Sequence, residues 1–183
     1  HQHGMKVFYW CLGTVSRQSP MHHGHPDWIC CDRNSAPSVA IGHPLLYCMD
    51  YNTGWSDYFA ERMLKLKEQT GIDGLFVDSY HNLNFQVINY ADPELRTNMP
   101  GLIAWQRCMR EAGLELMIET SGIFGASLNW LDRGYLKTEA NAGLEHTFYK
   151  SILCLKTYWL TSGRIDETFC YRAMANNAPI RLE

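Results

Sequence analysis

Four acidic residues, Asp50, Asp78, Glu119 and Glu139, each follow a short stretch of strand-like sequence. Carboxylates that lie close together shift one another's pKa values, so that one stays ionised beside another that holds its proton. Cleavage of a glycosidic bond uses such a pair, one carboxylate as nucleophile or base and one as acid. Because Asp after a strand is also a common turn or cap residue, each acid alone has a structural explanation. Their repetition at four strand ends favours a catalytic role over a purely structural one.

The segments before the acids have the length of β-strands and are followed by helical patterns. Strands are expected at 6–12, 45–49, 75–77, 114–118, 135–138 and 179–182. Helices are expected at 56–70, 100–112 and 141–160, with Ser56 capping the first, Gly71 ending it and Gly113 ending the second.

This alternation of strand and helix predicts a parallel sheet built from right-handed crossovers. Part of a (β/α)8 barrel, the TIM-barrel fold, fits best, and an open doubly wound sheet comes second. In a barrel the C-terminal ends of the strands gather on one face, where the active site lies. The four acids would then surround one opening. Two long loops, 13–44 and 79–98, are expected to carry function.

Aromatic residues are frequent near the predicted strand ends, and flat rings with polar rims suit stacking on sugars. For each ring, packing in the core is the simpler alternative. His81 follows Asp78 closely and either donates a hydrogen bond to a sugar or caps the loop. The candidate substrate-binding residues are Trp10, Trp28, Asp50, Tyr80, His81 and Trp130.

Five segments in order resemble the α-galactosidase (melibiase) type of retaining glycoside hydrolase. The most specific are "HPDW" at 25–28 and "GIDGLFVD" at 71–78, which resembles that family's "GIDYLKWD" nucleophile strand. Weaker matches are "GMKVFYW" at 4–10 to "GMKFGLW", "CMDYN" at 48–52 to "LDLTN", and "IETSG" at 118–122 to "FESCSSGG". The resemblance covers roughly residues 4–145.

The resemblance implies a (β/α)8 barrel, of which residues 1–183 would form a single domain, truncated at both ends, with about the second to seventh strands. It implies hydrolysis of a terminal α-linked sugar by double displacement. Asp78 would be the nucleophile, and Glu139, in the place of an Asp in the family's "WTSDN", the acid/base. Glu119 is the rival acid/base. No metal or organic cofactor is required, because two carboxylates and a water suffice.

Two departures bear on the substrate. The family's acidic "EPE" is replaced by residues 12–14, "LGT", and the substrate-contacting Lys two residues before the nucleophile is replaced by Phe76. Sugar specificity therefore does not carry over. A non-catalytic carbohydrate-binding barrel and an amylase-type or other α-glycosidase barrel are the alternatives.

The charge and cysteine content of the sequence limit the classes of binding partner and the kinds of cysteine site that we expect. With 16 basic and 19 acidic residues and no long basic cluster, neither nucleic acid nor a membrane is expected as a partner. Seven cysteines, an odd number without paired C-x-x-C motifs, predict reduced thiols rather than a disulfide framework or zinc site. That count and the lack of a visible signal peptide slightly favour the cytoplasm. The histidines at 22, 23 and 25 could chelate a metal, but the resemblance places His25 in a structural loop, and no metal site is predicted.

Overall fold

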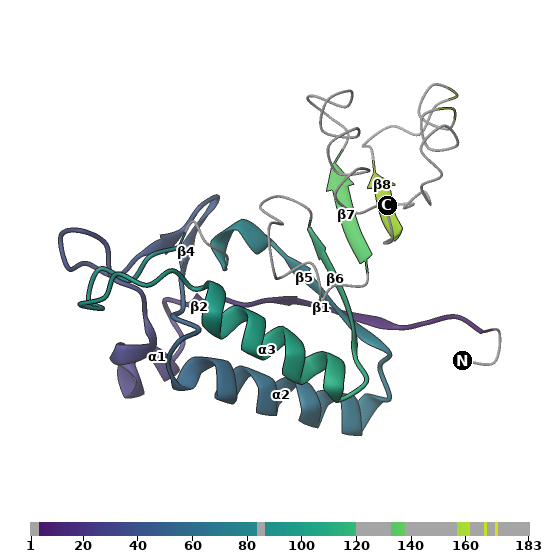
Figure 1. The fold of residues 1–183 in the computed structure, drawn as a ribbon, viewed down its shortest axis with the longest axis horizontal. Coiled ribbons are helices and arrows are strands. Elements are labelled where there is room, and N and C mark those ends of the chain that lie inside the picture. The colour runs from purple at the N-terminus through teal and green to yellow at the C-terminus, as the bar shows by residue number, and fades with distance from the viewer. Residues whose placement is uncertain are drawn as a thin grey trace.

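The computed structural model describes residues 4–83, 87–119, 133–137 and 157–161, together with residues 167 and 171. Its main feature is a parallel sheet of five strands in the order β1-β5-β6-β7-β8 (Figure 1). The strands are β1 (Phe8–Leu12), β5 (Gly74–Asp78), β6 (Glu115–Glu119), β7 (Arg133–Lys137) and β8 (Thr157–Thr161). Every neighbouring pair in this sheet is parallel, which confirms the parallel strands expected near 6–12, 75–77, 114–118 and 135–138.

The strand expected at 45–49 belongs to a different sheet, which corrects the prediction that it joins the parallel one. β4 (His43–Tyr47) pairs antiparallel with β2 (Val15–Ser16) and with β3 (Val39–Ala40). The physical reason is local: Gly42, at φ +78°, lets the chain turn back sharply between β3 and β4. A tight turn of this kind joins antiparallel strands, whereas parallel strands need a long crossover.

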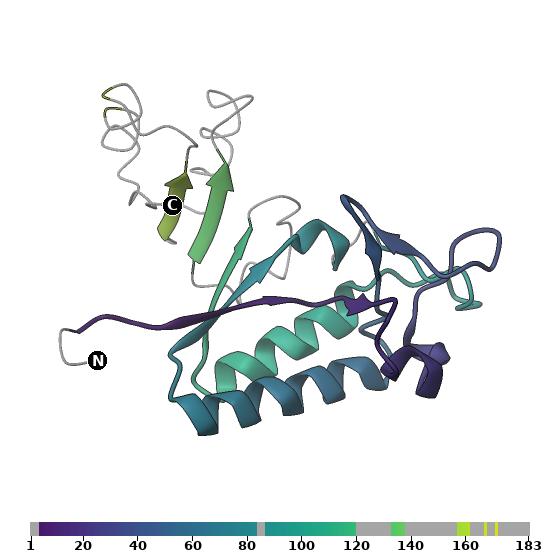
Figure 2. The same cartoon turned by 180° about the vertical axis from the view of Figure 1, so that it is seen from behind.

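Two helices cover one face of the parallel sheet, and they lie side by side (Figures 1 and 2). In α2 (Gly54–Thr70) the side chain of Thr53 caps the first turn by accepting from the Trp55 N–H, so the expected cap at Ser56 is wrong by three residues. Gly71 ends α2 in the left-handed conformation at φ +69°, as expected. The second helix, α3 (Met99–Glu111), begins with a Pro in its first turn.

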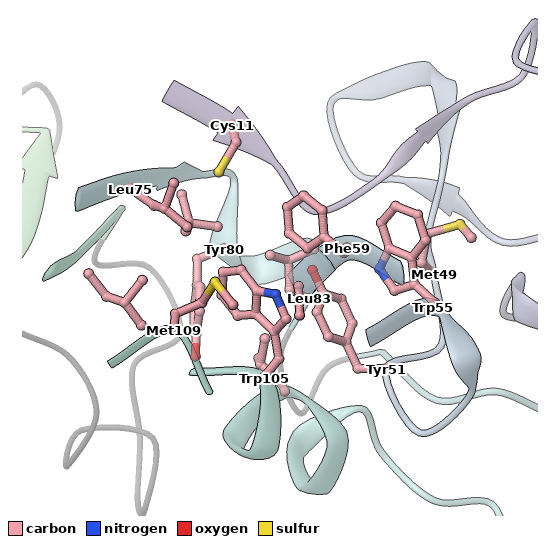
Figure 3. Packing of buried hydrophobic residues seen from close by; sticks show 14 of the residues in the cluster. Cys11, Met49, Tyr51, Trp55, Phe59, Leu75, Tyr80, Leu83, Trp105 and Met109 are labelled. Carbon is pink, nitrogen blue, oxygen red and sulfur yellow. The ribbon is translucent and has the colours of Figure 1, made fainter. Parts of the chain in front are cut away.

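The hydrophobic core lies between these helices and the sheet (Figure 3). The ring of Phe59 from α2 stacks on Trp105 from α3 at 5.1 Å between centroids, and it stacks on Trp55 at 5.3 Å. Leu75 of β5 and Leu116 of β6 are fully buried in the same cluster. Leu75 and Val77, two residues apart in β5, both belong to this cluster, so the face of the sheet that they share is the face that the helices cover.

One predicted helix, in the C-terminal part of the chain, is wrong in its last residues. The segment 141–160 was expected to be helical, yet residues 157–161, rich in β-branched and aromatic side chains, form β8 beside β7. Most of that segment, and the strand expected at 179–182, lie outside the described residues.

Further elements are short: α1 (Met21–Gly24), the 3₁₀ helix η1 (Pro26–Trp28) and the 3₁₀ helix η2 (Tyr80–Asn82). The five cysteines in the described part of the chain are all free thiols, as expected: Cys11, Cys30, Cys31, Cys48 and Cys108. Within the same residues, no helix combines the length and the apolar character that a membrane span requires.

Candidate active site at the ends of the parallel strands

Asp78 is the last residue of β5, which lies between β1 and β6 inside the parallel sheet. The four residues before it in the strand are buried, whereas Asp78 itself is half-buried. In register, Leu12 at the end of β1 lies opposite Asp78. The strand therefore fixes the backbone of Asp78 in the core and brings its carboxylate to the C-terminal edge of the sheet.

Ser79, directly after Asp78, turns the chain sharply. Its backbone is left-handed, at φ 52° and ψ 42°, a conformation uncommon for residues other than Gly. The Ser79 N–H donates to Oδ1 of Asp78 at 2.8 Å. The Ser79 hydroxyl lies 2.9 Å from Nε2 of His43, the first residue of β4. One buried serine thus contacts both the candidate nucleophile and the antiparallel sheet.

Asn82 makes a second connection between the same two regions. Its Oδ1 accepts from the backbone N–H of Ile41 at 2.7 Å, and its Nδ2 donates to the Ile41 carbonyl at 3.2 Å. The Asn82 N–H donates to the Ser79 carbonyl, which closes the turn that contains η2. The turn between β3 and β4 is therefore held against the turn after β5 at two separate points.

Glu119 is the last residue of β6, next to β5. The ladder pairs Val77 with Ile118, so the following residues of the two strands are Asp78 and Glu119. Glu119 also pairs with Tyr135 of β7. Two of the four acids thus end adjacent parallel strands. Glu139 lies beyond the end of β7, outside the described residues.

Asp50, by contrast, is not at the end of a parallel strand. It is 3% exposed, and its Oδ1 accepts from the N–H and the side-chain amide of Asn52 at 2.8 and 3.0 Å. Its Oδ2 accepts from Nδ2 of Asn89 at 2.9 Å. Both carboxylate oxygens are therefore occupied within the fold, where they join the start of α2 to the loop before α3.

Tyr80 is also enclosed. Its side chain is fully buried, and its hydroxyl accepts from Nε2 of Gln106 in α3 at 2.6 Å. The backbone of His81 lies in η2, three residues beyond Asp78. Trp130 lies outside the described residues.

The two remaining candidate tryptophans differ in environment. Trp10 is 51% exposed, and its backbone pairs with that of Phe76, two residues before Asp78. Trp28 is half-buried: its ring stacks on His25 at 3.7 Å between centroids and lies against Gly54 at the start of α2. Of the two, Trp10 presents more ring surface on which a sugar could stack.

The histidine cluster engages in ring contacts. His22 and His23 lie 3.8 Å apart between centroids, and His25 stacks on Trp28. Among the described residues, no group of three or more His, Cys, Asp or Glu side chains is arranged to hold a metal ion.

Cys11 lies beside the candidate nucleophile. Burial, with a smaller contribution from the negative charge of Asp78, raises the pKa of its thiol to about 12. In register Cys11 pairs with Val77 on the adjacent strand. The thiol next to Asp78 therefore stays protonated at neutral pH and adds no charge to the site.

A hollow of about 210 Å³ is lined by Ile41, Asn82 and Tyr90, among other residues. This volume is below the range of roughly 300–1,000 Å³ that small-molecule sites occupy. We therefore place the candidate chemistry at the strand ends and not in this hollow.

Sequence reasoning missed His43, Ser79 and the Asn82–Ile41 pair. A signal for the turn was present in the segment "IGHP" at 41–44, because Gly followed soon by Pro marks a reversal of the chain. Nothing in the sequence indicated that this reversal would lie against the turn after β5.

Comparisons with solved structures find similar folds. The GH36 α-galactosidase AgaA of Geobacillus stearothermophilus, as a variant in complex with 1-deoxygalactonojirimycin, matches with a TM-score of 0.70 at 19% identity. α-L-Fucosidase isoenzyme 2 of Paenibacillus thiaminolyticus matches with a TM-score of 0.63 at 15% identity. Aspergillus fumigatus Ega3, in complex with galactosamine, also matches with 0.63, at 10% identity.

These matches cover 100%, 98% and 98% of this chain, in the same order, but 28%, 34% and 74% of the other chains. The chain thus spans about a quarter to a third of the first two proteins. No protein-family profile matches the sequence, and no curated protein matches it. At these identities the likeness is one of fold, and the chain has the α/β fold with a parallel sheet that occurs within glycoside hydrolases.

Proposed function

We propose that residues 1–183 belong to the (β/α)8 catalytic barrel of a retaining glycoside hydrolase that cleaves a terminal α-linked sugar, as an α-galactosidase does. The observation that carries the proposal is the position of Asp78. It ends an interior parallel strand, it is more exposed than the residues before it, and it is oriented by a backbone N–H. Barrel enzymes hold their catalytic groups at this edge of the sheet.

In the proposed reaction Asp78 attacks the anomeric carbon, and the aglycone leaves with a proton from the acid/base. A covalent glycosyl-enzyme forms, which water then hydrolyses with the same acid/base acting as base. Because the Ser79 N–H binds Oδ1, we assign the attack to Oδ2. The step uses two carboxylates and a water, so it calls for no cofactor.

Glu139 and Glu119 are the two candidates for the acid/base. Glu139 is supported by its position in the sequence match. Glu119 is supported by the ladder, because adjacent strands lie about 4.8 Å apart and Glu119 follows the residue paired with Val77. Retaining enzymes hold their two carboxyl groups about 5–5.5 Å apart, a spacing that neighbouring strand ends can supply.

For substrate contacts we retain Trp10, Trp28, His81 and Trp130. Asp50 and Tyr80 are left out, because each is buried and its oxygens are bonded within the protein. The proposed sugar class rests on fold neighbours that bind 1-deoxygalactonojirimycin and stachyose. Phe76, 6% exposed, supplies no charge for a sugar hydroxyl, so the particular sugar is the least constrained part of the proposal.

The test is to trap the covalent intermediate in the full-length protein. A 5-fluoro-α-galactosyl fluoride should inactivate the enzyme with time, and mass spectrometry should place the added mass on the peptide that contains Asp78. Asp78→Asn should abolish both turnover and labelling, while Asp27→Ala, an exposed acid, should change neither. Turnover that survives Asp78→Asn would overturn the proposal. Sugar binding without turnover on a panel of aryl α-glycosides would instead favour a non-catalytic carbohydrate-binding barrel.

A further inference from the structure

The turn between β3 and β4 lies against the turn that follows the candidate nucleophile. His43 meets the hydroxyl of Ser79, and Ile41 is bonded twice by the side chain of Asn82. These contacts join residues about 40 positions apart in the chain, in or beside turns next to strands of two different sheets. A part of the protein outside the parallel sheet is therefore in direct contact with the segment that directly follows Asp78.

Ser79 is the link through which this contact reaches the carboxylate. Left-handed backbone is unfavourable for a side chain with a Cβ, and it persists where surrounding contacts hold it. In Ser79 this conformation accompanies an N–H directed at Oδ1 of Asp78, while the hydroxyl of the same residue meets Nε2 of His43. The Ser79 N–H lies in the peptide plane that joins Asp78 to Ser79, so a shift of Ser79 that rotated this plane would move the N–H away from Oδ1 of Asp78.

We infer that His43 is a positioning residue for the Asp78 carboxylate, acting through the hydroxyl and the strained backbone of Ser79. The inference rests on the proposed function, in which Asp78 is the nucleophile. It adds a role for the antiparallel sheet: β4 carries the group that holds the nucleophile's orientation. His43 touches neither the sugar nor the reacting atoms in this arrangement.

The two connections between the turns make this role separable from simple packing. Asn82 binds the backbone of Ile41 independently of the imidazole. Loss of the His43 side chain therefore leaves the β3–β4 turn attached, while the contact of the Ser79 hydroxyl with the imidazole is lost. The expected defect is in the orientation of Asp78 and not in the folding of the hairpin.

The test measures steady-state kinetics and the rate of labelling by the 5-fluoro-α-galactosyl fluoride, in the full-length protein. His43→Ala should lower kcat and the labelling rate about tenfold or more, with KM within about twofold, because misorientation costs the chemical step more than binding. Ser79→Ala should cause a similar loss. The double variant should be no slower than either single variant, since both remove one interaction. His43→Gln, which keeps a side-chain N–H, should recover most of the rate.

His23→Ala is the matched control, because His23 is an exposed histidine in α1, and its kinetics should equal those of the unaltered protein. Wild-type kcat in both His43→Ala and Ser79→Ala would overturn the inference, as would additive losses in the double variant. Failure of the proposed function looks different: Asp78→Asn would remain active, or the unaltered protein would turn over substrate and yet not be labelled by the inhibitor. An inactive Asp78→Asn beside a fully active His43→Ala rejects the inference alone.

Discussion

The side-chain amide of Asn89 donates to the buried carboxylate of Asp50 at 2.9 Å, which ties the loop before α3 to the segment that leads into α2. Asn89 in turn accepts from the backbone N–H groups of Cys31 and Ala91. One acid thus organises three stretches of loop. The network explains why an acid that resembles a site residue in the sequence is enclosed in the structure.

Replacing Asp50 with Ala should therefore destabilise the fold. The buried amide of Asn89 would lose its acceptor, and the half-buried amide of Asn52 would keep only the Thr97 carbonyl. The loss should be about 3 kcal/mol in the free energy of unfolding. Urea unfolding followed by tryptophan fluorescence measures it. Asp50→Asn should cost less, because one acceptor oxygen remains, and Asp27→Ala, at an exposed position, should cost almost nothing. Equal stability of Asp50→Ala and Asp27→Ala would contradict the network.

The aromatic stack of the core gives a second prediction. Trp105 is 2% exposed and stacks on Phe59, so Trp105→Ala should lower the free energy of unfolding by about 3–5 kcal/mol. The Trp105 indole N–H finds no hydrogen-bond acceptor in the described part of the chain. Trp105→Phe removes that buried donor and keeps an aromatic ring, so it should cost less than about 2 kcal/mol.

Chemical denaturation measures the free energy of unfolding of Trp105→Ala and Trp105→Phe. Trp10→Ala, which removes an exposed tryptophan, is the control. If Trp105→Phe were as unstable as Trp105→Ala, the contribution assigned to stacking would be wrong.

The buried thiols predict the alkaline limit of stability. Burial raises the pKa of Cys11 from 9.0 to about 12 and that of Cys48 from 9.0 to about 11. A raised pKa means that the folded state holds the proton more tightly than the unfolded state. The stabilisation is therefore complete below about pH 9 and is lost as the pH rises toward 11–12, by up to about 1.4 kcal/mol per pH unit for each thiol.

Unfolding curves between pH 8 and 10.5 test this, and Cys11→Ala should flatten the decline relative to Cys108→Ala, which removes a half-buried thiol. In the native protein at pH 8.5, iodoacetamide should leave Cys11 and Cys48 unmodified. Rapid alkylation of either thiol would show that the reagent reaches it in the native protein and would contradict its burial.

The proposed acid/base can be distinguished by its dependence on the leaving group. Glu139→Gln should slow hydrolysis of a p-nitrophenyl α-galactoside by about 10²–10⁴, and hydrolysis of a dinitrophenyl analogue, whose aglycone needs no proton, much less. Azide should restore turnover and give the α-glycosyl azide, which NMR identifies. The same set of measurements on Glu119→Gln completes the comparison. The role belongs to whichever variant shows this pattern, and a pattern in neither variant would refute the proposed pairing with Asp78.

Local sequence patterns correctly predicted the elements whose structure depends mainly on residues within the element itself. Buried apolar segments such as 75–77 needed the centre of a sheet, and Gly71 could end a helix in a conformation that other residues avoid. The acid at the end of β5 followed from the same reasoning. These features depend on few residues, close together in the chain.

What the sequence did not reveal depends on long-range pairing. The predicted strand at 45–49 is an apolar run like that of an interior strand, yet β4, at 43–47, pairs antiparallel with its hairpin partner β3. Asp50 and Asp78 look alike in sequence, and only the amides of Asn52 and Asn89 separate the enclosed acid from the accessible one. The contact between His43 and Ser79 has no local signature, because each residue is ordinary in its own segment.

The antiparallel sheet has a consequence for how the protein can change over evolutionary time. Residues 13–73 connect β1 to β5, while residues 79–114 connect β5 to β6. The entropy of closing a loop grows only with the logarithm of its length, so the longer connection costs only about 0.5 kcal/mol more than the shorter one. Insertions at the exposed positions of loop 13–53, which contains β2, β3 and β4, therefore cost the parallel sheet little in loop entropy. Such changes would have to keep the core residues Val15, Ile29, Met49 and Tyr51, the hydrogen bonds of Asp50 and the contact between His43 and Ser79.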